Sequence, residues 1–344
     1  MRALTTRLGL LALGLAAALL LAEGVLRVTG LAPEVAYVEK WRMRLSGNPK
    51  IGFEPIPNLD STDASIQFFG YRGLSNSLGF RDREHPVEKP PGRKRIVVLG
   101  DSLTAGLWVE KDEDVFPAVL ERNLAAAGRA IDVLNFGVLG YNTQQEVETL
   151  REKGLRYGPE LVVLAYCLND RWRDDGGLYL HLLDEEKKSG RLNVARVGPW
   201  LAYSALFRFS RFRVLPALRA SQAGEKERDL EHYGADTVDA SFATLSELAR
   251  QQGFEVLVVT FPDLRSIEAR ESEYPFGSEH RQTAQLARDN GFRHLDLLPA
   301  MRACKEAQPD ELIAFDSLHP RPLGYRCAAD AISELVLRDV WPDG

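Results

Sequence analysis

The sequence is poor in cysteine, with only Cys167, Cys304 and Cys327 among 344 residues. No two of them have the CxxC spacing of a zinc or redox site, so metal binding through thiolates is not expected. The chain also lacks an excess of positive charge, because 43 Lys and Arg stand against 49 Asp and Glu, for a net charge of -6. These absences exclude a thiolate zinc site and exclude nucleic acid as the main partner.

Long apolar runs are scarce as well, and the one that approaches a membrane span, residues 8–22, lies at the N-terminus. It follows Arg2 and Arg7 and continues past Glu23, so it reaches the roughly 20 residues that a spanning helix needs. We predict an uncleaved transmembrane anchor over residues 1–30, with a cytoplasmic N-terminus and an exported remainder. A cleaved signal peptide is the alternative, because its charged start and apolar middle are both present.

Residues 31–92 carry prolines and glycines between aromatic residues, a pattern typical of short strands and turns. Within them the run NSLGFRDRE, residues 76–84, precedes a Pro-rich linker at 86–92. We predict that this run is a loop or strand covering the sheet of the domain that follows. Residues 31–92 are therefore expected to form a strand- and turn-rich segment docked on that domain.

From Arg93 onward, short apolar runs alternate with stretches of helical spacing. This alternation, with short connections, predicts an α/β domain with βαβ units, a parallel sheet and right-handed crossovers. The domain is expected to span residues 93–340. We predict strands at 96–99, 131–136, 161–166, 254–261 and 292–297, and helices at 115–127, 143–155, 238–251, 279–290 and 322–337.

An insertion at about residues 171–235 interrupts this alternation. Within it, residues 200–219 are aromatic and basic, with no acidic residue. One interpretation is a helix in the membrane interface, with its arginines near lipid phosphates. We favour a cap helix packed on the domain, because the apolar residues do not all lie on one helical face.

Several polar or small residues stand where a predicted strand stops or a helix begins. In a doubly wound sheet, the carboxyl ends of adjacent parallel strands face one crevice, and ligands bind there. Ser102 follows the first strand, Gly140 and Asn169 follow the second and third, and Asp316 and His319 precede the last helix. The sequence therefore predicts that these residues meet in a single site at one edge of the sheet.

These residue types suit nucleophilic catalysis. A serine hydroxyl becomes a nucleophile when a base takes its proton, and His319 is the natural base at neutral pH. Asp316 would hold the tautomer of His319 and stabilise the imidazolium as it forms. The backbone N–H groups of Ser102 and Gly140, together with the side-chain amide of Asn169, would form the oxyanion hole for a tetrahedral intermediate.

Each of these residues also has a simpler explanation. Asp101 and Ser102 can cap the helix that follows them, and Asn169 can end a strand in a turn. His319 is one of six histidines, so by itself it carries little information. Cys167 is expected to be a small buried side chain rather than a nucleophile. The catalytic interpretation therefore depends on the set of residues taken together.

The motifs GDSLTAG, NFGVLGYNT, CLND and DSLHP, in this order, resemble the four blocks of the SGNH, or GDSL, hydrolase superfamily. The resemblance covers about residues 93–338. It implies a three-layer α/β/α sandwich with a flavodoxin-like sheet, and ester hydrolysis without a metal or another cofactor. By this resemblance, Ser102 matches the family's nucleophile. The oxyanion donors match Ser102, Gly140 and Asn169. Asp316 matches the acid and His319 matches the base.

Two features of the site motifs concern this resemblance: one separates the chain from another hydrolase family, and the other departs from the usual SGNH pattern. The GxSxG elbow of the α/β-hydrolases is absent, because residue 104 is Thr and the glycine comes at 106. The SGNH superfamily usually has glycine two residues before the asparagine of its third block, where this chain has Cys167. This exchange would narrow the site or alter the preference for the acyl group.

The N-terminal apolar run, the NSLGFRDRE segment and the insertion resemble a membrane-tethered bacterial subset of the superfamily, which acts on acyl esters of lipids or acetyl groups of envelope polysaccharides. The expected function is a membrane-anchored, extracytoplasmic serine esterase that cleaves such an ester through an acyl-Ser102 intermediate. An O-acyltransferase that passes the acyl group to a sugar hydroxyl is an alternative. A non-catalytic envelope assembly protein is another, but a scaffold has no need of the set Ser102, Asn169, Asp316 and His319.

Cys304 and Cys327 flank the loop that contains His319. In an exported protein, two such cysteines are a candidate disulfide. The pairing is a hypothesis from the sequence alone, because a disulfide requires a specific separation of the two Cα atoms.

Overall fold

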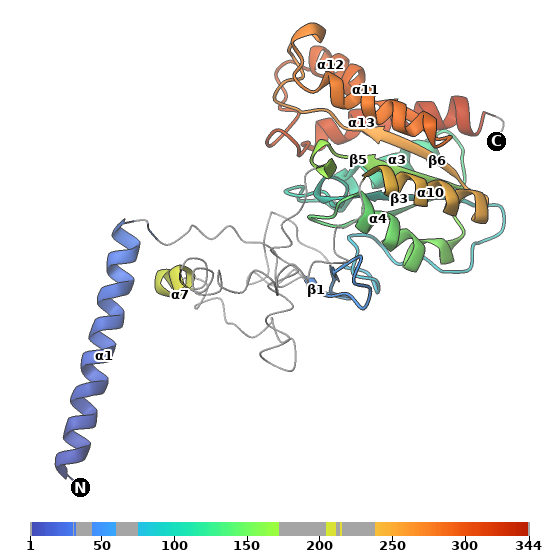
Figure 1. Cartoon of the computed structure of the whole chain (residues 1–344). Coiled ribbons are helices and arrows are strands. Elements are labelled where there is room, and N and C mark those ends of the chain that lie inside the picture. Colours follow the sequence, from blue (N-terminus) through green and yellow to red (C-terminus); the bar gives the residue numbers. More distant parts are fainter. Residues whose placement is uncertain are drawn as a thin grey trace. The chain divides into compact units, whose positions relative to one another are not determined.

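The computed structural model describes residues 2–29, 31, 43–59, 75–171, 204–210, 214 and 238–342 of the chain. By their contacts these residues fall into two units (Figure 1). One unit lies within residues 1–41 and 180–231, and the other within residues 42–179 and 232–344. The second unit contains the main sheet and every residue of the predicted site.

The larger unit is built on a five-stranded parallel sheet. Its strands β3, β5 and β6 are buried along almost their whole length, because helices cover both faces. The strand order is that of a flavodoxin-like sheet, which confirms the predicted fold and puts the switch point between β3 and β5. In their order across the sheet, the strands are β4 (Ile131–Gly137), β3 (Lys94–Gly100), β5 (Leu161–Tyr166), β6 (Glu255–Thr260) and β7 (Arg293–Asp296).

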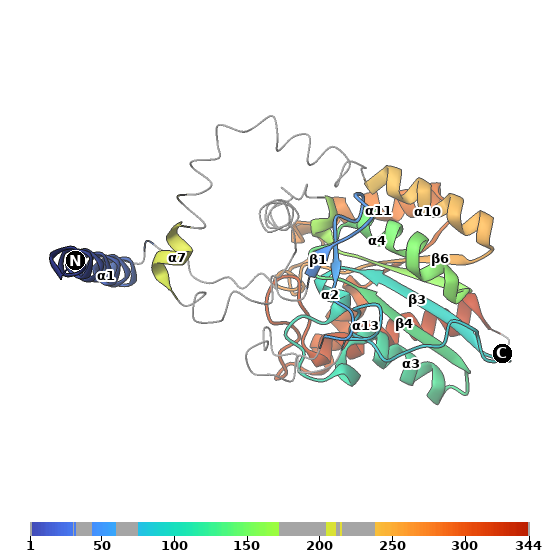
Figure 2. The same ribbon diagram turned by 90° about the horizontal axis from the view of Figure 1, so that it is seen from below.

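Helices cover the two faces of the sheet and complete the predicted three-layer sandwich (Figure 2). On one face, α13 packs against both α3 and α12; on the other, α10 packs against α4 and α11. The first group is α3 (Phe116–Ala126), α12 (Leu298–Ala307) and α13 (Pro322–Leu335). The second group is α4 (Thr143–Thr149), α10 (Val238–Gln252) and α11 (Gly277–Asp289).

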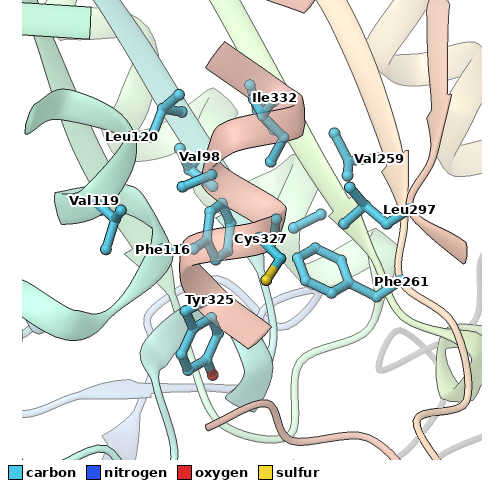
Figure 3. Close-up of a cluster of buried hydrophobic side chains, with 14 of the residues drawn as sticks. Val98, Phe116, Val119, Leu120, Val259, Phe261, Leu297, Tyr325, Cys327 and Ile332 are labelled. Carbon is cyan, nitrogen blue, oxygen red and sulfur yellow. The ribbon is translucent and has the colours of Figure 1, made fainter. Parts of the chain in front are cut away.

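The main hydrophobic core lies between the sheet and the layer formed by α3 and α13 (Figure 3). Val98 of β3 and Val259 of β6 are fully buried there together with Phe116 of α3. The ring of Tyr325 from α13 stacks on Phe116, with 6.2 Å between their centroids. Its hydroxyl donates a 2.7 Å hydrogen bond to the carbonyl of Leu103 in α2 (Ser102–Ala105). The core therefore fixes the helix that follows β3 to the last helix of the chain.

All five predicted strands form, and their observed ends differ from the predicted ones by at most two residues. The predicted helix at 143–155 is α4 followed by a π-helical turn, Leu150–Gly154, and a 3-10 turn, Leu155–Tyr157. Helix α12 was not predicted. Pro299, which suggests a break in a helix, occupies the first turn of α12, where no intrahelical N–H is needed.

Residues 43–59 contain a small antiparallel sheet that packs on α4. Its strands are β1 (Met43–Leu45) and β2 (Phe53–Pro55). The Gln145 amide of α4 donates to the Ile51 carbonyl at 2.7 Å, and the Tyr141 hydroxyl donates to the Phe53 carbonyl at 2.7 Å. Both side chains follow β4, so the small sheet lies against the loop and helix that leave the carboxyl end of this strand.

Helix α1 (Arg2–Thr29) belongs to the smaller unit, and over Gly9–Thr29 it is long and apolar enough to cross a membrane. Its leucines are largely exposed, among them Leu20 at 73% and Leu11 at 70%. An N-terminal helix with so much exposed apolar surface is typical of a membrane anchor or of a signal sequence. Both interpretations given for the N-terminal run therefore remain.

Helix α7 (Ala205–Phe209) packs against α1 in the same unit. The Glu23 carboxylate of α1 accepts 2.8 Å hydrogen bonds from the backbone N–H groups of Ala205 and Leu206 and from the Ser204 hydroxyl. These contacts satisfy the Glu23 carboxylate, which is the acidic side chain near the end of the apolar run, with hydrogen bonds. Of the predicted helix at 200–219, the structure describes residues 204–210 and 214, and the others lie outside the described residues.

A disulfide between Cys304 and Cys327 joins α12 to α13, with 6.1 Å between the two Cα atoms. This pairing agrees with the hypothesis drawn from the sequence. Cys167 is a free, buried cysteine, as expected of a small core side chain. The disulfide fixes the helix that begins directly after the His319 loop to its neighbour.

Replacing Cys304 and Cys327 together by serine is expected to lower the free energy of unfolding by about 3 kcal/mol, because the loop of 23 residues that they close no longer restricts the unfolded chain. Urea unfolding measures the change. Reduction of the unsubstituted protein should have a similar effect, and Cys167→Ala serves as the control that keeps the disulfide. A double variant as stable as the unsubstituted protein contradicts the prediction.

Candidate active site

The first site residue stands at the point where β3 ends and α2 begins. Asp101 caps this helix, since its Oδ1 accepts a 2.9 Å hydrogen bond from the N–H of Leu103. The capping explanation therefore holds for Asp101. It does not account for Ser102, whose hydroxyl contacts a side chain 217 residues further along the chain.

That side chain is His319. The Oγ atom of Ser102 lies 2.9 Å from Nε2 of His319, and Nδ1 of the same ring lies 2.8 Å from Oδ2 of Asp316. Oδ1 of Asp316 accepts backbone N–H groups from Leu318 and His319, each at 2.8 Å. Burial opposes ionisation of Asp316, but the hydrogen bonds from His319 and Leu318 outweigh it and lower the pKa of Asp316 below its ordinary value. The arrangement is that of a serine, a base and an orienting carboxylate.

The loop that carries Asp316 and His319 is held by backbone hydrogen bonds. Phe315 N donates to His319 O at 2.8 Å, which closes the turn between the two site residues. Leu264 N, after β6, donates to Ser317 O at 2.7 Å and ties the turn to the carboxyl edge of the sheet. The imidazole therefore reaches Ser102 from a loop fixed at both sides.

The predicted oxyanion donors lie at the same edge of the sheet. Gly140 is three residues beyond the end of β4 and has φ of 76°, which favours glycine. The Asn169 Nδ2 atom donates to Asp101 Oδ2 at 3.2 Å. An amide nitrogen carries two hydrogens, so this bond orients the Asn169 side chain and leaves its second hydrogen for another acceptor.

The approach of α2 to β4 depends on Gly137. A Cβ atom at this position would lie 2.4 Å from Ala105 N and 2.6 Å from Thr104 C, so a larger residue would push the helix of Ser102 away from the sheet. In the sequence, Gly137 is recognisable only as part of a motif. The structure gives it the role of letting the loop after β4 and the helix that begins at Ser102 lie side by side.

Three buried carboxyl groups lie close together on the carboxyl side of β3 and β5: Asp101, Glu146 and Asp170. Burial raises the pKa of each of them, and the neighbouring carboxyl groups raise the pKa of Glu146 and Asp170 further. Among the residues that the structure describes, neither carboxyl oxygen of Glu146 has a hydrogen-bond partner. Glu146 is therefore favoured in its neutral form in the folded protein.

Glu146→Gln is expected to reduce the pH dependence of stability. Because the pKa of Glu146 is raised on folding, its contribution is complete below its ordinary pKa of 4.5 and is lost as the pH rises toward the folded value. One such group contributes a slope of at most about 1.4 kcal/mol per pH unit. Urea unfolding from acid to mildly alkaline pH measures it, with exposed Glu247→Gln as the control. A decline as steep in the Glu146→Gln variant as in the unsubstituted protein contradicts the prediction.

Sequence reasoning did not find Trp108, whose ring lies against the imidazole of His319 with 4.8 Å between centroids. A single tryptophan in a loop carries no sequence signal for such a contact. In the described part of the chain, no group of three or more His, Cys, Asp or Glu side chains is arranged to hold a metal ion. All five predicted site residues lie at the carboxyl edge of the sheet, and the side chains of Ser102, His319 and Asp316 are in direct contact.

The match to a known family agrees with this geometry. The model of the GDSL-like Lipase/Acylhydrolase family matches residues 98–327. The chain belongs to this family. The GDSL-like match begins within β3 and ends within α13, so it includes Ser102, Asn169 and His319. It confirms the resemblance indicated by the four motifs, and it identifies the protein as an ester hydrolase of the GDSL-like family.

Solved structures with a similar fold include three esterases or acylhydrolases. An acetyl xylan esterase has 16% identity and a TM-score of 0.42, over 70% of this chain and 99% of that one. A lipase/acylhydrolase from Enterococcus faecalis has 20% identity and a TM-score of 0.41, over 71% and 95%. A two-domain esterase active on acetylated mannans has 15% identity and a TM-score of 0.42, over 72% and 49%. No curated protein sequence matched the chain.

Proposed function

We propose that the protein hydrolyses an acyl ester through a covalent acyl-Ser102 intermediate. The observation that carries the proposal is the continuous contact from Ser102 Oγ to His319 Nε2, at 2.9 Å, and from His319 Nδ1 to Asp316 Oδ2, at 2.8 Å. In this role His319 is the general base, and Asp316 holds its tautomer and stabilises the imidazolium.

The proposed reaction has two halves. His319 takes the proton of Ser102 as Ser102 Oγ attacks the ester carbonyl. The oxyanion of the tetrahedral intermediate then accepts hydrogen bonds from the N–H groups of Ser102 and Gly140 and from the Asn169 side chain. His319 returns the proton to the leaving alcohol, which leaves the acyl group on Ser102. His319 then takes a proton from water as the water oxygen attacks the acyl carbon, and it returns this proton to Ser102 Oγ as the bond to Ser102 breaks and the acid is released.

The proposed substrate is an acyl ester of a lipid or of an envelope polysaccharide, cleaved outside the cytoplasm. Two features support this location. Arg2 and Arg7 precede the apolar stretch Gly9–Thr29 of α1, as in an anchor with a cytoplasmic N-terminus, and the Cys304–Cys327 disulfide is typical of an oxidising compartment. On this proposal residues 1–30 are the anchor, residues 31–92 dock on the hydrolase domain, and that domain spans 93–340 with its insertion at about 171–235.

Trapping the acyl-enzyme tests the proposal directly. The full chain, solubilised in detergent, is incubated with p-nitrophenyl acetate and with a fluorophosphonate, and the modified peptide is identified by mass spectrometry. Release of p-nitrophenol and modification at Ser102 are the expected results; no release, or a label elsewhere, overturns the assignment. Adding an acylated donor with a polysaccharide acceptor separates hydrolysis from acyl transfer, because only transfer yields an acylated acceptor.

A further inference from the structure

Trp108 contacts the proposed catalytic base, although it lies outside the four sequence motifs. Its ring is nearly perpendicular to that of His319, at 70°, with 4.8 Å between centroids, and it also lies 5.9 Å from the Phe315 ring. The backbone of Trp108 has φ of 64°, in the left-handed region that bulky residues rarely occupy. Such a conformation persists only where the surrounding structure imposes it.

The backbone on both sides of Trp108 is bound by Arg81, from the NSLGFRDRE segment. Its guanidinium donates to three carbonyls at the end of α2 and in the loop that follows it: Ala105 at 3.3 Å, Gly106 at 2.6 Å and Val109 at 2.8 Å. The side chain is 7% exposed, and its Nε is paired with Asp112 at 2.8 Å. One planar guanidinium therefore binds the loop on both sides of Trp108.

The Arg81 backbone is itself fixed to the sheet. The ring of the preceding Phe80 is buried against Phe136 of β4, with 4.4 Å between centroids. The following Asp82 accepts the N–H of Asn135 at 2.8 Å, and the Asn135 amide donates at 3.2 Å to the Arg81 carbonyl. The guanidinium thus extends from a rigid base on β4 to the loop of Trp108.

We propose that Trp108, held in place by Arg81, is a positioning residue for His319. Hydrogen bonds hold the imidazole at its two nitrogens, toward Ser102 and toward Asp316, and the Trp108 ring occupies the space beside it. With this ring in place, His319 cannot rotate away from the line between the other two side chains. The inference rests on the proposed role of His319 as the base, and it makes residues before the matched family span part of the working site.

The test compares four variants of the full chain in detergent, with kcat and KM for p-nitrophenyl acetate as the readouts. Trp108→Ala is expected to lower kcat by about 10- to 100-fold with little change in KM, because His319 is then misplaced in the reacting complex. Trp108→Phe should recover most of kcat, since a ring is restored. Arg81→Gln should lower kcat as well. The double variant, Arg81→Gln with Trp108→Ala, should be no slower than the slower single one, because both changes remove the same contact.

Arg83→Gln is the matched control, because Arg83 comes from the same segment but pairs with Glu121 at 2.9 Å and does not contact the loop. Its kcat should equal that of the unsubstituted protein. If Arg81→Gln does not fold, Arg81→Lys takes its place; it keeps the charge but lacks the planar fork, and a reduced kcat is expected. Thermal unfolding is measured for every variant, so that a loss of folded protein is not counted as a loss of rate.

The results that overturn the inference differ from those that overturn the proposed function. An unchanged kcat in Trp108→Ala, a loss confined to KM, or effects of Arg81→Gln and Trp108→Ala that multiply in the double variant each remove the positioning role. A KM effect alone would instead make Trp108 a wall of the substrate site. A Ser102→Ala variant that keeps more than about a tenth of the activity refutes the proposed function, whatever the variants at positions 81 and 108 do.

Discussion

Ser102→Ala is expected to lower kcat/KM for p-nitrophenyl acetate by at least about 10,000-fold, because no acyl-enzyme can form without the hydroxyl. The remaining rate would come from the oxyanion donors alone, which can still polarise the carbonyl toward attack by water. The measurement is the release of p-nitrophenol by the full chain at neutral pH.

Two controls accompany this substitution. The Ser102→Ala variant should unfold at the same temperature as the unsubstituted protein, because Ser102 is only part-buried and its hydroxyl contacts His319 rather than a group of the core. Ser246→Ala removes a serine that bonds the Asn290 carbonyl instead, and it should keep full activity. An alanine variant at position 102 with more than about a tenth of the activity would contradict the nucleophile assignment.

Asp316→Asn is expected to lower kcat/KM by about 1,000- to 10,000-fold, through the tautomer of His319. Oδ1 of Asp316 accepts two backbone N–H groups, each at 2.8 Å, so the oxygen of asparagine would take this position. The NH₂ group of asparagine would then replace Oδ2 and donate to His319 Nδ1. In the unsubstituted protein, Oδ2 lies 2.8 Å from this nitrogen. The imidazole would carry its proton on Nε2 and could not accept the proton of Ser102.

NMR of the imidazole nitrogens gives a second readout, since it distinguishes the two tautomers directly. The Asp316→Asn variant should show the Nε2-protonated form, whereas the unsubstituted protein should show the Nδ1-protonated form at neutral pH. The lowered pKa of Asp316 keeps its carboxylate ionised well into the acid range, so the orienting role does not depend on pH near neutrality. A variant with near-normal kcat/KM, or with an unchanged tautomer, is incompatible with this role for Asp316.

The sheet and the meeting of Ser102 with His319 could be predicted because they depend on short-range patterns. Apolar runs mark strands covered on both faces, and parallel strands bring their carboxyl ends to one edge. Helix α4 could be predicted as a helix but not as a buried one. Its residues Thr143–Thr149 are mostly polar, yet all are buried, because α10 packs on them and the chain from 43 to 59 supplies partners such as the Ile51 carbonyl. Such a partner lies far away in sequence and leaves no local signal.

The same limit applies to Arg81 and Trp108. The run around Arg81 could be predicted to dock on the following domain, but the carbonyls that its guanidinium binds are in a loop without a distinctive pattern. A buried arginine satisfied by carbonyls and a tryptophan with positive φ are both decided by three-dimensional packing.

The disulfide and the Arg81 contacts show where this hydrolase cannot be trimmed. A fragment limited to the family span, residues 98–327, would begin inside β3, which starts at Lys94, and would stop at Cys327 in the middle of α13. It would also lose the guanidinium, so that the carbonyls of Ala105, Gly106 and Val109 would have to find water instead. The smallest piece able to fold and turn over substrate is therefore longer, at both ends, than similarity to relatives suggests.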